Sequence, residues 1–211
     1  MAESHESSEA SLTSFLTALA TADAAHAAVS AAAVAGGLGT SLLLMVAALP
    51  VARSDSPVHR AALIESSDAL KRIQQQLLES IETETVVRIF SATKMPQGSP
   101  AERTEREAAI QLALRAAADV PLEVIRLCAL ALKHATIVAE HSSRAAADEV
   151  RLAVVLLQDG FSGAQANLEA RLSSVTDVVY TEAIVEEIAA LNTEAAAAAE
   201  AAERWVRPRP A

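Results

Sequence analysis

Hydrophobic residues recur at intervals of three and four through most of this 211-residue chain, the pattern of helices with one buried face. A serine followed by proline, as at Ser56 and Pro57, is typical of a helix start. Three helices are predicted in the first half of the chain. They are a short helix from Ser11 or Thr13 to about Ala20, a helix rich in alanine and glycine that stops at Pro50 (the small-residue helix), and a helix from Ser56 to about Thr93.

The second half contains the clearest loop signal, Met95-Pro96-Gln97-Gly98-Ser99-Pro100. Ser99 and Glu102 have the spacing of a capping box, which predicts that the next helix begins there. Asp119-Val120-Pro121 predicts a restart or kink. Further predicted elements are a helix to about Glu140, a turn at Ser142 and Ser143, and helices over 145–172 and 176–205.

The small-residue helix carries no Asp, Glu, Lys or Arg from Ala24 to Ala52. Its alanines and glycines recur at four-residue spacing, which predicts close packing on every side. A membrane span is the alternative. No Lys or Arg precedes Arg53, so no basic residue anchors a membrane span on that side. The first nine residues contain Glu but no Lys or Arg, which argues against a signal peptide. We therefore expect a cytoplasmic protein.

Composition supports an all-α fold, because aromatic residues make up only 2% of the chain and alanine favours helix. We predict a single-domain bundle of long helices around the small-residue helix, spanning residues 11–205. An acidic, disordered stretch (1–10) and a tail (206–211) flank it. The net charge of −10 argues against nucleic acid as a partner.

The sequence holds no strong catalytic motif and no spacing that predicts a metal site. His134 and His141 are expected to be solvated, whereas Cys128 lies in an apolar run and should be buried. Asn167 interrupts an apolar helix, so its amide needs partners or faces a ligand. The alanine-rich stretch 194–203 should be solvated or, as we favour, packed against a partner chain.

Four segments together resemble a known family. They are Ser14-Phe-Leu-Thr-Ala-Leu-Ala20, the small-residue helix closing on Met45-Val-Ala-Ala-Leu49, the run from Ile110 to Asp119-Val-Pro-Leu122, and Ala164-Gln-Ala-Asn-Leu168. Their order is similar to that of the formimidoyltetrahydrofolate cyclodeaminase / methenyltetrahydrofolate cyclohydrolase family, from about Leu12 to Asn192. The resemblance implies an all-helical fold and a homodimer. It also implies action on one-carbon tetrahydrofolate substrates, by water attack on a methenyl bridge or by ring closure with loss of ammonia.

The chain departs from that family at four places. His26-Ala-Ala-Val-Ser30 stands where the resemblance implies a proline and a glycine run, Val86 where it implies a carboxylate, and Gln97 where it implies a lysine. Asp148-Glu-Val-Arg151 stands where the resemblance implies Ser-Asp-Ala-Gly. Valine cannot transfer a proton, and proton transfer by a positioned group typically accelerates such reactions about 10²–10⁴-fold. The family positions that survive are Arg106, Pro121, Gly160 and Asn167.

We therefore predict a diverged family member whose interhelical cleft binds or transforms a small molecule other than the usual tetrahydrofolate. A non-catalytic dimeric scaffold and an active cyclohydrolase or cyclodeaminase are the alternatives. No cofactor is expected, unless a tetrahydrofolate derivative is bound because the family activity is retained. The predicted catalytic residues are His26 and Glu149, and the predicted ligand-binding residues are Ser30, Arg106, Arg151 and Asn167.

Overall fold

The computed structural model describes residues 13–17, 19–20, 27–49, 56–80 and 91–207. Every regular element within these ranges is helical, which confirms the predicted all-α class. The elements are α2 (Ala27–Ala47), α3 (Pro57–Glu79), α5 (Pro100–His141), the 3₁₀ turn η1 (Arg144–Ala146), α6 (Ala147–Leu172) and α7 (Val178–Val206). Residues 13–17 and 91–93 are also helical.

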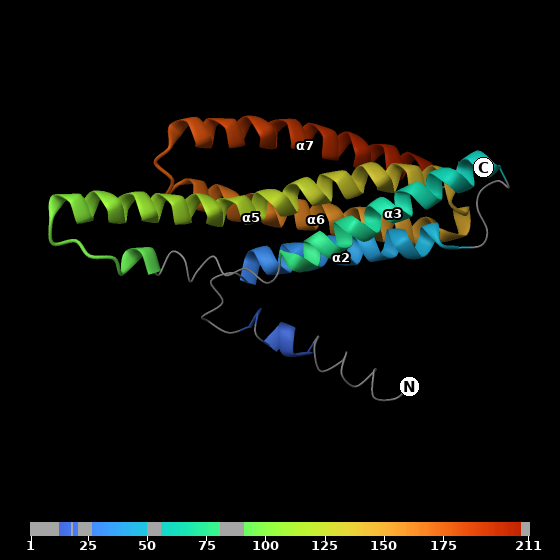
Figure 1. The fold of residues 1–211 in the computed structure, drawn as a ribbon. Helices are drawn as coiled ribbons and strands as arrows, with labels where there is room; N and C mark the ends of the chain where they lie inside the picture. The colour runs from blue at the N-terminus through green and yellow to red at the C-terminus, as the bar shows by residue number, and fades with distance from the viewer. Residues whose placement is uncertain (1–12, 18, 21–26, 50–55, 81–90, 208–211) are drawn as a thin grey trace.

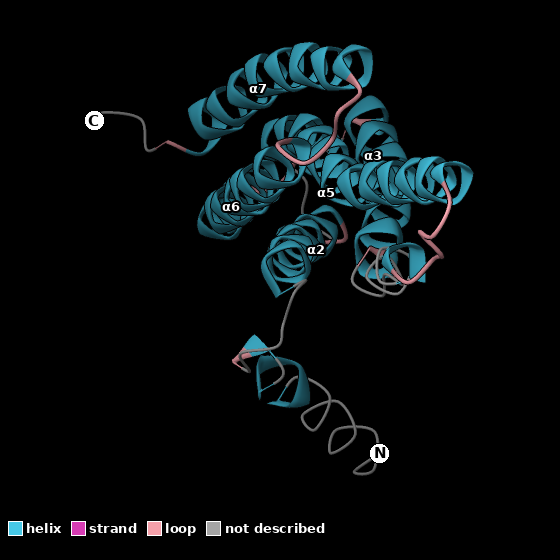
Figure 2. Ribbon diagram, turned by 90° about the vertical axis from the view of Figure 1, so that its left-hand side faces the viewer, coloured by secondary structure: helices cyan, strands magenta, loops and turns pink. Residues whose placement is uncertain are grey.

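Helix α5, rather than the small-residue helix α2, holds the central position in the bundle. It packs extensively against α2, α3, α6 and α7, which surround it in the end-on view (Figure 2). Its first turns, from Pro100, project beyond the other helices (Figure 1). Most side chains of this projecting part are exposed, whereas the half of α5 that follows Ala117 supplies much of the core.

The most extensive helix contact joins α2 and α6, and glycine makes it possible. A Cβ added to Gly160 would lie 2.8 Å from the carbonyl oxygen of Ala32 and 2.9 Å from the nitrogen of Gly36. One added to Gly39 would lie 2.8 Å from the carbonyl oxygen of Ala153. The two backbones therefore touch, and these pairs show that α2 and α6 run antiparallel.

Close packing on every side of α2 was expected, and this expectation is wrong. One face of α2 is exposed along its length, with Leu38 54% and Met45 46% accessible. None of the other described helices covers this face. Apolar length alone makes α2 a possible membrane span, but more than half of the span from Ala28 to Ala47 is buried in the bundle, as in the core helix of a soluble protein. The cytoplasmic location stays a prediction.

Helix α5 runs unbroken through Pro121, so the predicted restart at Asp119–Pro121 is not observed. Its N-terminus is the predicted capping box: the Ser99 hydroxyl accepts a bond from the backbone nitrogen of Glu102 (3.2 Å), whose carboxylate accepts one from the nitrogen of Ser99 (2.7 Å). These bonds hold the pKa of Glu102 below its usual value. The described part of α3 ends at Glu79, so its predicted continuation toward Thr93 falls partly outside the described residues.

One face of the alanine-rich stretch of α7 is buried within the chain itself, whereas Ala196 and Ala197 on the other face are exposed. Ala195, Ala198, Ala199 and Ala202 are buried in the core of their own chain. The Thr136 hydroxyl of α5 donates to the carbonyl oxygen of Ala198 (3.0 Å). Alanine is small enough for α7 to approach α5 closely, which accounts for the alanines of the buried face. A partner chain on the exposed face stays a prediction.

Replacing Gly160 by alanine should destabilise the bundle by about 1–3 kcal/mol, because backbone atoms of α2 occupy the space that the methyl group needs. Gly37→Ala is the matched control, since a Cβ there meets nothing within 4 Å. Alanine favours helix by up to about 1 kcal/mol over glycine, so this control should be neutral or stabilising. Urea unfolding of both variants measures the difference, and equal stabilities would contradict the contact.

Candidate functional site

The predicted site residues lie at different ends of the bundle. Ser30 lies in the first turns of α2 and is 8% exposed. Asn167 lies near the end of α6, and the antiparallel packing brings this end of α6 alongside the start of α2. His26 lies outside the described residues.

Glu149 and Arg151 belong to the opposite end, because they lie in the first turns of α6. Along the helix axis Glu149 is roughly 27 Å from Asn167. Arg106 lies on the projecting part of α5, where its Nε donates to the carbonyl oxygen of Thr93 (3.2 Å). Within one chain the described residues of the predicted set therefore do not form one cleft, and their roles stay predictions.

Asn167 has a structural partner inside the bundle. Its Oδ1 accepts a hydrogen bond from Nε of Arg171 (2.7 Å), and Nη1 of Arg171 donates to the carbonyl oxygen of Ala117 (3.0 Å). That carbonyl would normally accept from the residue four positions later, which is Pro121 and has no N–H. Arg171 supplies the missing donor, and Asn167 orients it. This pairing gives the Oδ1 of Asn167 a partner within the chain, and the predicted ligand-binding role of Asn167 stays a prediction.

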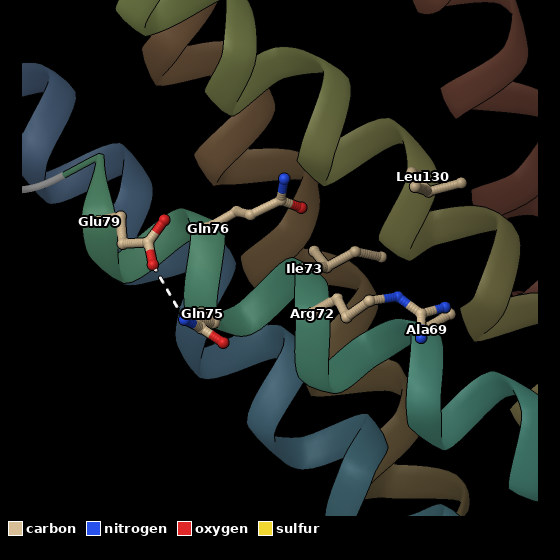
Figure 3. A pocket seen from close by; sticks show the side chains of 7 residues that line it. All are labelled: Ala69, Arg72, Ile73, Gln75, Gln76, Glu79 and Leu130. Atoms are coloured by element: carbon tan, nitrogen blue, oxygen red, sulfur yellow. Dashed lines mark hydrogen bonds between the residues drawn. The ribbon is translucent and has the colours of Figure 1, made fainter.

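A groove lies between α3 and α5. Its first part has a volume of about 440 Å³ and is lined by Ala69, Arg72, Ile73, Gln75, Gln76, Glu79 and Leu130 (Figure 3). Its second part, about 360 Å³, is lined by Gln76, Glu79, Ser80, Asp119, Val120 and Glu123. The two parts share Gln76 and Glu79, so they form one continuous groove.

Charge is distributed unevenly along the groove. Three carboxylates, those of Glu79, Asp119 and Glu123, line the part nearest the end of α3. The guanidinium of Arg72 lies in the other part, beside the apolar Ile73 and Leu130 (Figure 3). The groove therefore suits a ligand that is cationic at one end, anionic at the other and flat or apolar between them.

The three carboxylates differ in their partners. Glu123 pairs with Arg126 (3.4 Å), which also pairs with Glu187 on α7 (2.6 Å). Asp119 accepts a hydrogen bond from the Tyr180 hydroxyl (2.7 Å), and Glu79 accepts one from the amide of Gln75 (3.0 Å). No Lys or Arg among the described residues forms an ion pair with Asp119 or Glu79. Both carboxylates thus keep oxygen lone pairs for a cationic ligand.

Tyr180 holds Asp119 in place. Burial raises the pKa of the Tyr180 phenol, and the hydrogen bond to Asp119 raises it further. The phenol therefore stays protonated at neutral pH and donates to the carboxylate permanently. Arg115 lies over the Tyr180 ring, 5.6 Å from its centre, and pairs with Asp177 at the start of α7 (2.6 Å).

Neither histidine of α5 is the solvated residue that we expected. Nδ1 of His134 lies 3.3 Å from the hydroxyl of buried Ser66, and burial lowers the pKa of His134. His141 stacks on His59 of α3, with 4.4 Å between ring centres. Both belong to the α3–α5 contact. Cys128 is buried as predicted, and burial raises the pKa of its thiol to about 12.

The groove residues Arg72, Gln76 and Glu79 were missed in the sequence, because polar positions of an amphipathic helix resemble a solvated face. Asp119 was noted only as part of a motif. Among the described residues, no three His, Cys, Asp or Glu side chains are grouped so that they could hold a metal ion.

Fold and groove together define an all-α bundle with a groove between two of its helices. Comparison with known proteins places it further. The model of the formiminotransferase-cyclodeaminase family matches residues 11–190, so the chain belongs to this family. The family predicted from the sequence is thereby confirmed.

Two relatives and one solved structure illustrate the match. A methenyltetrahydrofolate cyclohydrolase of Methylorubrum extorquens is 28% identical over 88% of this chain and 90% of its own length. A formimidoyltransferase-cyclodeaminase of Rattus norvegicus is 28% identical over 89% of this chain, which spans only 35% of that relative. The crystal structure of formiminotetrahydrofolate cyclodeaminase from Thermotoga maritima shares the fold, with a TM-score of 0.80, 19% identity, and coverage of 92% of this chain and 94% of that one.

Replacing Arg171 by methionine should destabilise the chain by about 1–3 kcal/mol, because the carbonyl of Ala117 loses its donor. In a Pro121→Ala background the same change should cost less than half as much, since alanine restores the backbone N–H that bonds to this carbonyl. Urea unfolding of the four proteins measures the coupling. Arg103→Met, on the projecting part of α5, is the control and should cost the same in both backgrounds; an equal cost for Arg171→Met would contradict the repair.

Proposed function

We propose that the α3–α5 groove catalyses the addition of water to a cationic N–C–N one-carbon unit, with methenyltetrahydrofolate as the substrate. The observation that supports this most directly is the arrangement of charge: Glu79, Asp119 and Glu123 at one end and Arg72 at the other. A methenyl bridge between two nitrogens carries a positive charge, and the glutamate of a folate carries negative ones. The Methylorubrum relative, matched over nearly its full length, bears the name of this activity.

The proposed step needs one base and no redox chemistry. Water attacks the methenyl carbon, a new C–O bond forms, and a carboxylate accepts the water proton. One C–N bond then breaks as the C=O bond forms and the hydroxyl proton leaves. The protonated carboxyl gives its proton to the nitrogen that keeps the electron pair, so this nitrogen becomes N–H. A formyl group remains on the other nitrogen, and one proton is released to water. We assign the base to Asp119, because Tyr180 fixes its orientation. Glu79 faces the same part of the groove and stabilises the cation.

The other part of the groove would hold the remainder of the substrate. Arg72 lies next to Leu130 and Ile73 (Figure 3), so a flat ring can rest on apolar side chains while an attached carboxylate meets the guanidinium. Arg72 is also close enough to His134 to contribute to the lowered pKa of that histidine. His134 itself does not line the groove, and Arg72 is the only Lys or Arg among its described lining residues.

A different small molecule with the same charge pattern is the second candidate. Val29 is 1% exposed and Ser30 8%, so these two side chains are buried in the bundle. The resemblance implies glycine in this part of the chain, and this difference in sequence is the reason to keep a second candidate. Under this alternative the groove and its carboxylates act on an amidine-like compound that is not a folate.

Purified protein should hydrolyse methenyltetrahydrofolate, seen as loss of the methenyl absorbance. Asp119→Asn should lower kcat about 10²–10⁴-fold, because asparagine cannot accept the proton. Arg72→Gln should instead raise KM about tenfold with a smaller effect on kcat. The matched control is Glu105→Gln, an exposed carboxylate on the projecting part of α5.

Three outcomes separate the candidates. No rate above background together with tight binding of a cationic heterocycle in the groove would favour the second candidate. No rate and no binding would favour the non-catalytic scaffold. A normal rate that survives both Asp119→Asn and Glu79→Gln would remove the groove from the mechanism.

We further propose that the chain forms a homodimer through the exposed face of α2. The residues on this face are Ala31, Ala35, Leu38, Leu42, Met45 and Leu49, spaced alternately four and three apart. The face is graded, with small residues before Leu38 and large ones after it. An antiparallel copy centred on Leu38 would set large side chains against small ones, and no charge opposes the contact.

Leu38→Glu should convert the dimer to a monomer, because two copies of the charge would be buried near the centre of the interface. Sedimentation velocity measures the mass. Leu112→Glu is the control: Leu112 is 70% exposed on α5, away from α2, so this variant should keep the wild-type mass. A wild-type protein that is already monomeric at micromolar concentration would contradict the proposed dimer.

A further inference from the structure

A second hollow lies at the far end of the bundle from the acidic part of the groove. Its volume is about 310 Å³, and it lies where η1 leads into α6 and where α7 ends. Along α5, this end is separated from Asp119 by roughly 27 Å or more. It therefore does not belong to the site described above.

Three guanidinium groups from three elements line this hollow: Arg144 from η1, Arg151 from α6 and Arg207 after α7. One carboxylate, that of Asp148, lines it as well, so the lining carries two positive charges in excess in a chain whose net charge is −10. Positive charge is therefore concentrated in this hollow, although the chain as a whole is negatively charged.

The arginines are only partly neutralised. Arg151 pairs with Asp148 (2.7 Å) and also donates to the carbonyl oxygen of Val206 (3.3 Å), while Arg207 pairs with Glu203 (3.2 Å). Among the described residues no carboxylate lies within ion-pair distance of Arg144. One positive charge thus remains in excess.

Two further features add to the attraction for an anion. The hollow adjoins the first turn of α6, and the N-cap residue Ala146 has no side chain to accept from the N–H groups of that turn. Arg151 is held in place by its bonds to Asp148 and Val206, so binding costs it little conformational entropy. Glu149 lies in the same turn but does not line the hollow.

Trp205 supplies the remaining wall. It lines the hollow and is 40% exposed, so part of its indole is accessible to a planar group. A ring stacked on indole next to arginine is a common way to hold a flat anion. The volume is at the lower end of the range for small-molecule sites, about 300–1,000 Å³.

We propose that this hollow binds a small planar anion, with its phosphate or carboxylate at Arg144 and Arg151 and its ring against Trp205. The ligand class is that of a nucleoside monophosphate or an aromatic carboxylic acid. The proposal is independent of the reaction assigned to the groove, because the two sites share no lining residue.

Trp205 is the only tryptophan of the chain, so its fluorescence reports directly on this site. AMP and nicotinate, which combine a ring with an anionic group, should each change the emission in a saturable manner. Inorganic phosphate and adenosine, which carry only one of the two groups, should bind at least about tenfold more weakly. Added salt should weaken the binding of AMP.

Arg144→Gln should raise the Kd for AMP about tenfold, and Arg151→Gln should do the same. Arg103→Gln is the matched control, because Arg103 lies on the projecting part of α5, and its Kd should equal that of the wild type. Circular dichroism verifies that Arg151→Gln remains folded. Arg144 forms no ion pair with a described residue, so Arg144→Gln tests the site even if Arg151→Gln is misfolded.

Three results would overturn the proposal. The first is an emission that none of the probes changes at millimolar concentration. The second is an affinity for AMP that Arg144→Gln leaves unchanged. The third is equal affinity for phosphate and AMP, which would show that Trp205 contacts no ring.

Discussion

Direct contact between the backbones of α2 and α6 is the constraint on which the rest of the structure depends. Gly160 lies against Ala32 and Gly36, and a side chain at this position would force the two helices apart. The sulfur of Cys128 fills the remaining space, since it lies 3.2 Å from where a Gly160 Cβ would be. The contact fixes α2 and α6 against the central helix α5 as one unit.

In the part of α5 that borders the groove, one backbone hydrogen bond of the helix is missing and a side chain from α6 replaces it. Pro121 removes a backbone donor, and Arg171 reaches across from α6 to supply one to the carbonyl of Ala117. Burial lowers the pKa of Arg171, yet an arginine remains charged at neutral pH, so this donor is permanent. The proline lies directly after Asp119 and Val120, both of which line the groove. The cross-helix bond thus stabilises the segment that presents the proposed base.

Periodicity and caps in the sequence were sufficient to predict the fold class and most helix boundaries. Ser56–Pro57 and the Ser99–Glu102 capping box are local signals, and both helices begin where these signals predicted. Pro121 wrongly predicted a restart of the helix. The hydrogen bond that compensates for the missing N–H comes from Arg171 on another helix, and no local sequence pattern reveals such a partner. The site was harder for the same reason. Arg72 and Glu79 have the spacing of a solvated face, and only the antiparallel packing of α3 on α5 sets them beside Asp119 and Leu130. Glu149 and Asn167 share one helix, but its length keeps them at opposite ends of the bundle.

Loss of one catalytic residue of a family does not by itself remove the reaction, because a carboxylate can reach the same atom from another element. Val86 cannot accept a proton, but Asp119 and Glu79 supply two carboxylates from α5 and α3, and neither is neutralised by an ion pair within the described residues. The acidic part of the groove repels anions and attracts cations. A folate carries charge of both signs, so its glutamate needs a local cation, and Arg72 provides one about 10 Å along α3 from Glu79. Selectivity would then depend on the spacing between the two charged ends as well as on the base. A compound with the same cationic centre and no anion at that distance would interact with the carboxylates but not with Arg72.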